Sequence, residues 1–253
     1  AAQNNTGVGL GVFAALTSGD NNVAVGKSAL GTNTTGTSNT ALGCGALFDN
    51  TTGGSNIAIG KGSLINNTTA SDNTSIGTNA MIINTTGACN VAVGSSALYS
   101  NTTASNNTAI GILALCANTT GSTNVAIGRK TMCTNTTGAN NTAIGNQSLE
   151  QNTTADNNTA VGNASLDANT TGAGNTALGQ SSLGSNTTAS DNTAVGHQAL
   201  FTNVTGANNV AVGKNALYYN TASTNTAIGN LAMTNTSTGA GNTAVGQNAL
   251  TAN

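Results

Sequence analysis

The chain has 253 residues, of which 5% are charged and 2% aromatic, and its formal net charge is −2. This weak charge gives no basis for binding nucleic acid or an anionic membrane, and no apolar run approaches the roughly 20 residues of a membrane span. A polar composition with so little charge can indicate disorder. A strict internal period argues against disorder here.

A 17-residue repeat runs through the chain. The glycine of an [AS]-[VIL]-G motif recurs in steps of 17 from Gly26 to Gly213, with Gly9 one step earlier and Gly229 and Gly246 at the end. These are 15 copies, and only the step from Gly213 to Gly229 is shorter, at 16 residues. Positions are counted from this glycine as zero, so the consensus N-T-A-V-G-x-x-A-L-x-x-N-T-T-G runs from −4 to +10.

Each copy predicts one short β-strand at positions −3 to −1, from residues 6–8 in the first copy to 243–245 in the last. Gly, β-branched residues and Asn are poor helix formers, and the T-A-V alternation is typical of a strand. We expect positions −3 and −1 to face the core together with Leu at +4, and Ala at −2 to face outward. The invariant Gly and Asn are expected in turns with positive φ, with Asn stacked on Asn between copies.

A 17-residue unit cannot bury a core alone, but stacked units can. The sequence therefore predicts an all-β protein, a single parallel β-solenoid of about 15 coils with 17 residues per coil. One domain is expected to span residues 1–253 without a linker. At about 4.8 Å per coil, it would be roughly 70 Å long.

The titratable residues do not suggest catalysis. All twelve charged side chains occupy variable positions, which we expect to face water, and His197 is the one histidine, at the variable position +1. Catalysis needs convergent groups, and no such motif is found. We predict that the protein is not an enzyme and has no catalytic residues, metal site or cofactor.

The four cysteines match no metal-binding spacing. Cys116 and Cys133 both stand at +5 in adjacent copies, where in-register stacking would bring their Cα atoms to about 4.8 Å, within disulfide range. A disulfide or two stacked thiols are equally compatible with this spacing. Cys44 and Cys89 are expected to be free or paired between molecules.

The N-T-T segment at +7 to +9 is also an N-glycosylation sequon in almost every copy. It predicts either glycans along one edge of the solenoid or, as we favour, a stacked and buried Asn ladder.

The N-T-A-[VI]-G-x-x-A-L-x-x-N-T-T-G array resembles the repeat shafts of tail-fibre-like bacterial and viral proteins. Its N-[TV]-A-[VI]-G core is also similar to the head repeats of YadA-type trimeric autotransporter adhesins, which are parallel β-rolls. The resemblance covers the whole chain and implies a scaffold. The adhesin repeats are shorter than 17 residues, so the resemblance does not extend to their trimeric assembly.

Three functions are compatible with these features. We favour the structural subunit of an extracellular filament, a homopolymer whose chains join head to tail through uncapped ends. The alternatives are an ice-binding protein with a flat Thr/Ala ladder face, and the shaft of a viral fibre or adhesin. The start at Ala1 and Ala2 without Met fits a processed, secreted or cell-surface chain, and equally fits a fragment.

The spacing of the motif glycines across a joint between two chains favours head-to-tail assembly. If a second molecule followed Asn253, the step from Gly246 to the next Gly9 would be 16 residues, like the step from Gly213 to Gly229. The residues predicted to form this joint are Ala1, Ala2, Gln3, Asn4, Asn5, Thr6, Val8, Val245, Leu250 and Asn253.

A lateral contact between rods is predicted along the Ala column at position −2. Small outward methyl groups would allow another solenoid, or ice, to approach closely. The residues predicted to form this ladder are Ala24, Ala58, Ala92, Ala126, Ala160, Ala194 and Ala244.

Overall fold

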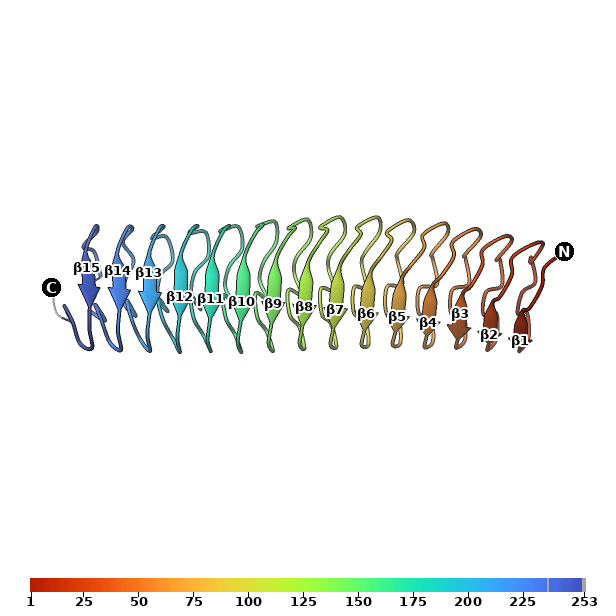
Figure 1. The fold of residues 1–253 in the computed structure, drawn as a ribbon, viewed down its shortest axis with the longest axis horizontal. Helices are drawn as coiled ribbons and strands as arrows, with labels where there is room; N and C mark the ends of the chain where they lie inside the picture. The colour runs from red at the N-terminus through yellow and green to blue at the C-terminus, as the bar shows by residue number, and fades with distance from the viewer. Residues whose placement is uncertain (236, 252–253) are drawn as a thin grey trace. The chain divides into compact units, whose positions relative to one another are not determined.

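The computed structural model describes residues 1–235 and 237–251. Two compact units make up the chain, Ala1–Asn124 and Val125–Asn253. The described residues form no helix, and every repeat contributes one three-residue strand that pairs in parallel with the strand of an adjacent coil. The predicted fold class, an all-β parallel β-solenoid, is confirmed (Figure 1). The single domain over residues 1–253 stays a prediction.

The first unit contains seven strands, each displaced from the last by one repeat. The strands are β1 (Thr6–Val8), β2 (Val23–Val25), β3 (Thr40–Leu42), β4 (Ile57–Ile59), β5 (Thr74–Ile76), β6 (Val91–Val93) and β7 (Thr108–Ile110). Each Cα pairs with the residue 17 positions away, as Thr40 does with Ile57. Equivalent residues of the repeat therefore stack directly on each other.

The second unit contains eight strands in the same arrangement. The strands are β8 (Val125–Ile127), β9 (Thr142–Ile144), β10 (Thr159–Val161), β11 (Thr176–Leu178), β12 (Thr193–Val195), β13 (Val210–Val212), β14 (Thr226–Ile228) and β15 (Thr243–Val245). The 16-residue coil keeps this register, since Val210 pairs with Thr226. This coil is one residue shorter in the turn after Asn220. Asn220 Nδ2 donates to the carbonyl of Ala222, two residues ahead, whereas the equivalent Asn203 donates to Gly206, three residues ahead.

Each coil turns through left-handed backbone conformations at positions 0, +2, +4 and +12. In one coil these are Gly145 (φ 135°), Gln147 (56°), Leu149 (53°) and Asn157 (61°). A left-handed conformation costs a non-glycine residue about 1–2 kcal/mol. Here each of the three non-glycine residues donates its backbone N–H to a backbone carbonyl of an adjacent coil, with N···O distances of 2.9–3.2 Å. The glycine turn is confirmed, whereas the expectation of positive φ at the invariant Asn positions −4 and +7 is wrong.

The core is the column of Leu and Met at +4, all fully buried from Leu30 to Leu217, as predicted. The orientation predicted for the strand is wrong. The side chain at −2 points inward and is buried in every strand from Ala24 to Ala244, and it is Ala in all of them except β5, which has Ser75, whereas Val25 at −1 is 39% exposed. The narrow coil interior is already filled by Leu and by Asn side chains, and only the small side chains of Ala and Ser75 occupy position −2. The Ala column therefore cannot form a lateral contact or an ice-binding plane.

Two ladders of buried Asn side chains join successive coils, as predicted. At position −4, Asn158 Oδ1 accepts the backbone N–H of Asn175 at 2.9 Å, and its Nδ2 donates to the carbonyl of Gly172 at 3.0 Å. At position +7, Asn152 Nδ2 donates to Asn135 Oδ1 at 2.7 Å. These amides satisfy backbone groups that the turns would otherwise leave buried without a partner.

Candidate binding surface

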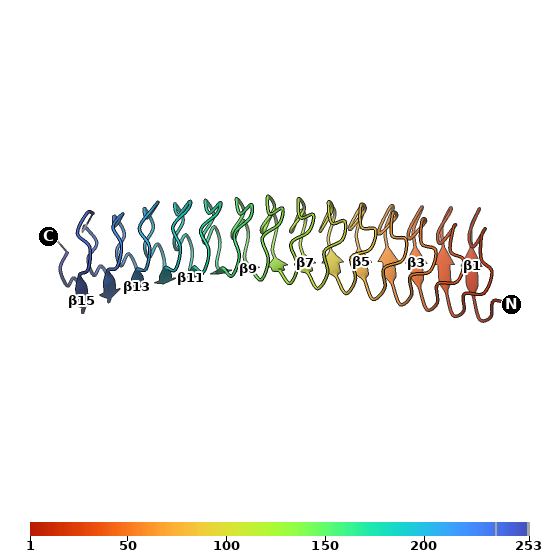
Figure 2. The same cartoon turned by 90° about the horizontal axis from the view of Figure 1, so that it is seen from above.

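The strands present two outward columns of side chains, at positions −3 and −1, which we name the strand face. In the first unit these are Thr6, Val8, Val23, Val25, Thr40, Leu42, Ile57, Ile59, Thr74, Ile76, Val91, Val93, Thr108 and Ile110. In the second unit they are Val125, Ile127, Thr142, Ile144, Thr159, Val161, Thr176, Leu178, Thr193, Val195, Val210, Val212, Thr226, Ile228, Thr243 and Val245. In Figure 2, the strands of each unit follow one another in a row. Sequence reasoning missed this face because it took these columns for core.

No charged side chain lies in either column of the strand face. The twelve charged residues are all exposed or half-buried, as predicted, and they occupy the turns and the other sides of the coil. His197 is also exposed. The strand face is thus a neutral surface of methyl groups and Thr hydroxyls.

A second side of the coil carries the variable positions +5 and +6, where three aromatic rings gather. The ring of Tyr218 stacks on Phe201 at 5.3 Å between centroids and meets Tyr219 edge-on at 4.6 Å. Phe201 leans over Gly184 of the preceding coil, where an added Cβ would lie 2.8 Å from the ring. The sequence signal for this cluster is the position +5 that Phe201 and Tyr218 share in consecutive copies.

The same +5 column brings two carboxylates together in consecutive coils, Glu150 and Asp167. Glu150 Oε1 forms an ion pair with Lys130 Nζ at 3.7 Å, and Glu150 Oε2 accepts a hydrogen bond from Gln147 Nε2 at 2.7 Å. Asp167 Oδ1 is buried without a hydrogen-bond partner among the described residues. Burial first, and the Glu150 charge second, raise the pKa of Asp167 above its usual value.

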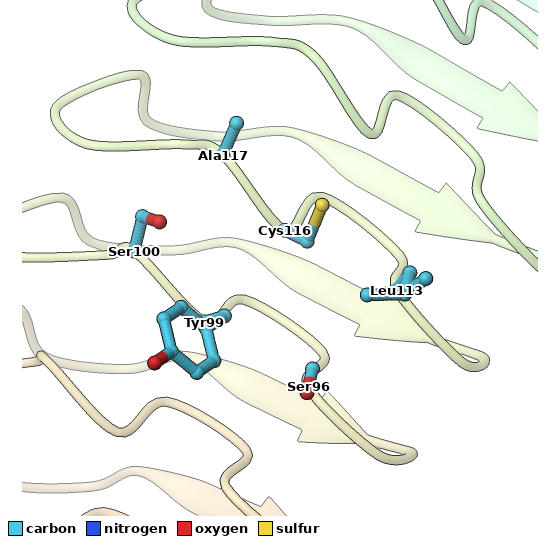
Figure 3. Close-up of a pocket in the computed structure, with 6 residues that line it drawn as sticks. All are labelled: Ser96, Tyr99, Ser100, Leu113, Cys116 and Ala117. Atoms are coloured by element: carbon cyan, nitrogen blue, oxygen red, sulfur yellow. The ribbon is translucent and has the colours of Figure 1, made fainter.

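A hollow of about 320 Å³ lies on this side in the first unit. It lies over two consecutive coils and is bordered by Tyr99 and Leu113 (Figure 3). The lining residues are Ser96, Tyr99, Ser100, Leu113, Cys116 and Ala117. The lining residues include no Lys, Arg, His, Asp or Glu.

The cysteines fall in two environments. Cys44 and Cys89 are exposed and form no disulfide among the described residues. Pairing between molecules stays a prediction. Cys116 and Cys133 are both half-buried at position +5, one in each unit. The disulfide between them stays a prediction.

The N-T-T sequons fall on buried asparagines. Asn50 is fully buried, and its Nδ2, the atom that would carry a glycan, donates to Asn33 Oδ1 at 2.8 Å and to the carbonyl of Gly53 at 2.9 Å. A sugar cannot be attached there without opening the coil. The geometry favours the buried ladder over glycans at these positions.

The residues predicted for the head-to-tail joint lie in the first and last coils. Thr6 and Val8 are exposed in β1, and Val245 is 68% exposed in β15. Asn253 lies outside the described residues. The joint itself stays a prediction.

Within the described ranges, no three His, Cys, Asp or Glu side chains are grouped so that they could hold a metal ion. No helix there is long and apolar enough to span a membrane. No family model, curated protein or solved structure matches the chain.

Proposed function

We propose that this protein is a structural subunit of an extracellular filament, in which the coils of neighbouring molecules stack end to end. The observation that carries the proposal is the bonding between coils within each unit. Each coil offers the next one the same set of donors and acceptors, so a coil surface is complementary to any coil of the same sequence pattern.

Three kinds of hydrogen bond repeat at this coil-to-coil surface. The strands pair through their backbones, the Asn ladders bond side chain to backbone, and Thr hydroxyls at +8 bond the next coil, as Thr34 Oγ1 does to the carbonyl of Thr51 at 2.9 Å. Adding an in-register strand to an open sheet edge is a known mode of protein association. The likeness to tail-fibre-like shafts supports the same role, and the shaft of a viral fibre or adhesin would use the same stacking.

Asn242 provides a sharp test. Its backbone N–H donates to Asn225 Oδ1 at 2.9 Å. Within both units, the Oδ1 of the equivalent Asn accepts the backbone N–H of the following coil. An incoming molecule would therefore use Asn242 Oδ1 in the same way. Asn242→Ala removes this acceptor, and Asn242→Asp keeps it.

Negative-stain electron microscopy and sedimentation over a range of protein concentrations measure the outcome. We expect filaments from the unmodified protein, much slower growth for Asn242→Ala, and growth closer to normal for Asn242→Asp. Circular dichroism confirms that each variant is folded. A folded, unmodified protein that stays monomeric at every concentration contradicts the proposal.

A further inference from the structure

The strand face has a regular two-dimensional geometry within each unit. Parallel, in-register pairing places equivalent residues one above another, as Ala41 and Ala58 show between β3 and β4. Neighbouring strands in such a sheet lie about 4.8 Å apart, and residues two apart along a strand are separated by roughly 6.6 Å. Positions −3 and −1 thus form a lattice with these two spacings.

The chemistry of this lattice is uniform. Position −1 is always Val, Ile or Leu, and position −3 is Thr, Val or Ile. Every one of these side chains carries a methyl group, and the Thr residues add a hydroxyl. Val25, Ile110 and Leu178 are 37–39% exposed, so the methyl groups reach solvent while their stems are fixed by the coil.

We propose that the strand face binds ice. Methyl groups accept no hydrogen bonds, so water above them must bond to neighbouring water molecules, and the regular spacing favours a planar, ordered layer. The Thr hydroxyls can anchor that layer by hydrogen bonds.

The strand face carries no charged side chain, which supports ice, an uncharged lattice of water molecules, as its partner. A Lys or Asp side chain would orient water around itself and break the planar layer, and the described strand face has neither. The Asn ladders also favour a flat surface, since side-chain ladders are one of the means by which sheets of many strands stay untwisted.

A second protein molecule fits this surface less well. The cores of protein interfaces are enriched in aromatic residues, Met and Arg, and their binding energy comes from a few such anchors. The strand face has none of them, and the stacked rings of Phe201 and Tyr218 lie instead in the +5 column. Self-association through the strand face is therefore an outcome that the experiment must separate from ice binding.

The test compares Thr→Tyr substitutions on and off the strand face. Thr74→Tyr and Thr176→Tyr place a bulky ring in the middle of the strand face of the first and second unit. Thr86→Tyr and Thr188→Tyr make the same change at position +9, where both side chains are exposed on another side of the coil. Thermal hysteresis and inhibition of ice recrystallisation are measured for each, with circular dichroism to confirm folding and sedimentation to follow association.

We expect activity in the unmodified protein, loss of activity in the double variant Thr74→Tyr/Thr176→Tyr, and full activity in Thr86→Tyr/Thr188→Tyr. A folded, unmodified protein without hysteresis or recrystallisation inhibition would overturn the inference, and association that only the strand-face variant abolishes would assign the face to a second copy instead. Equal loss in both variants would exclude the strand face as the binding surface. None of these outcomes depends on filament formation.

Discussion

At the scale of single residues, Asp167 is placed where its charge is unfavourable. Burial and the nearby Glu150 raise the pKa of Asp167 in the fold above its usual value, so the folded protein holds the proton more tightly than the unfolded chain does. The resulting penalty is fully present above the folded pKa and disappears as the pH falls below the unfolded value. We therefore predict that Asp167→Asn raises the melting temperature near neutral pH and that the gain vanishes in acid. Thermal denaturation across pH tests this, with the exposed Asp191→Asn as the control, which should change little.

At the scale of the coil, the Asn ladder supplies bonds that the short strands cannot. Asn158→Ala removes the acceptor for the N–H of Asn175, which is left buried without a partner. The carbonyl of Gly172 loses the donor Asn158 Nδ2 but keeps the hydrogen bond from Asn169 Nδ2 at 2.9 Å. One such group costs about 1–3 kcal/mol, so we predict a loss of roughly 1–3 kcal/mol in the free energy of unfolding. Asn163→Ala makes the same change at an exposed position and should cost little. Denaturant unfolding measures both, and equal stability of the two variants would show that the ladder is not essential.

The coil also shows what the sequence could and could not predict. The strict period predicted the parallel stack, the in-register pairing, the Leu column and the Asn ladders, because identical residues repeat only where they stack. The strand orientation could not be predicted. In a three-residue strand, two side chains point to one side and one to the other, and this pattern is too short to show which side is buried. Hydrophobicity alone places Val23 and Val25 inward and Ala24 outward. The opposite holds because the volume left beside Leu30 in so narrow a coil accommodates Ala and excludes Val.

That reversal determined which residues could be named as a binding surface. The Ala column, predicted to be the contact, is core, and the Thr and Val columns, predicted to be core, form the strand face. The left-handed conformation of Leu149 was not foreseeable from composition either, because a bulky residue ordinarily avoids positive φ. It follows from the coil path, in which Leu149 donates its N–H to the carbonyl of Ser165 in the next coil while its side chain enters the core.

At the scale of the whole molecule, stability should be local, because the strands contact only those of adjacent coils within the described units. In such proteins each repeat is stabilised by its own residues and its nearest neighbours. Leu64→Ala leaves a cavity in the +4 column of the first unit, which costs about 2–5 kcal/mol. We predict that hydrogen exchange then accelerates in the coils around Leu64, while peptides from residues 125–253 keep most of their protection. Leu183→Ala is the matched variant in the second unit and should give the reverse pattern, read by mass spectrometry of the exchanged peptides. An equal loss of protection throughout the chain in both variants would instead show that all 15 repeats unfold as one cooperative structure.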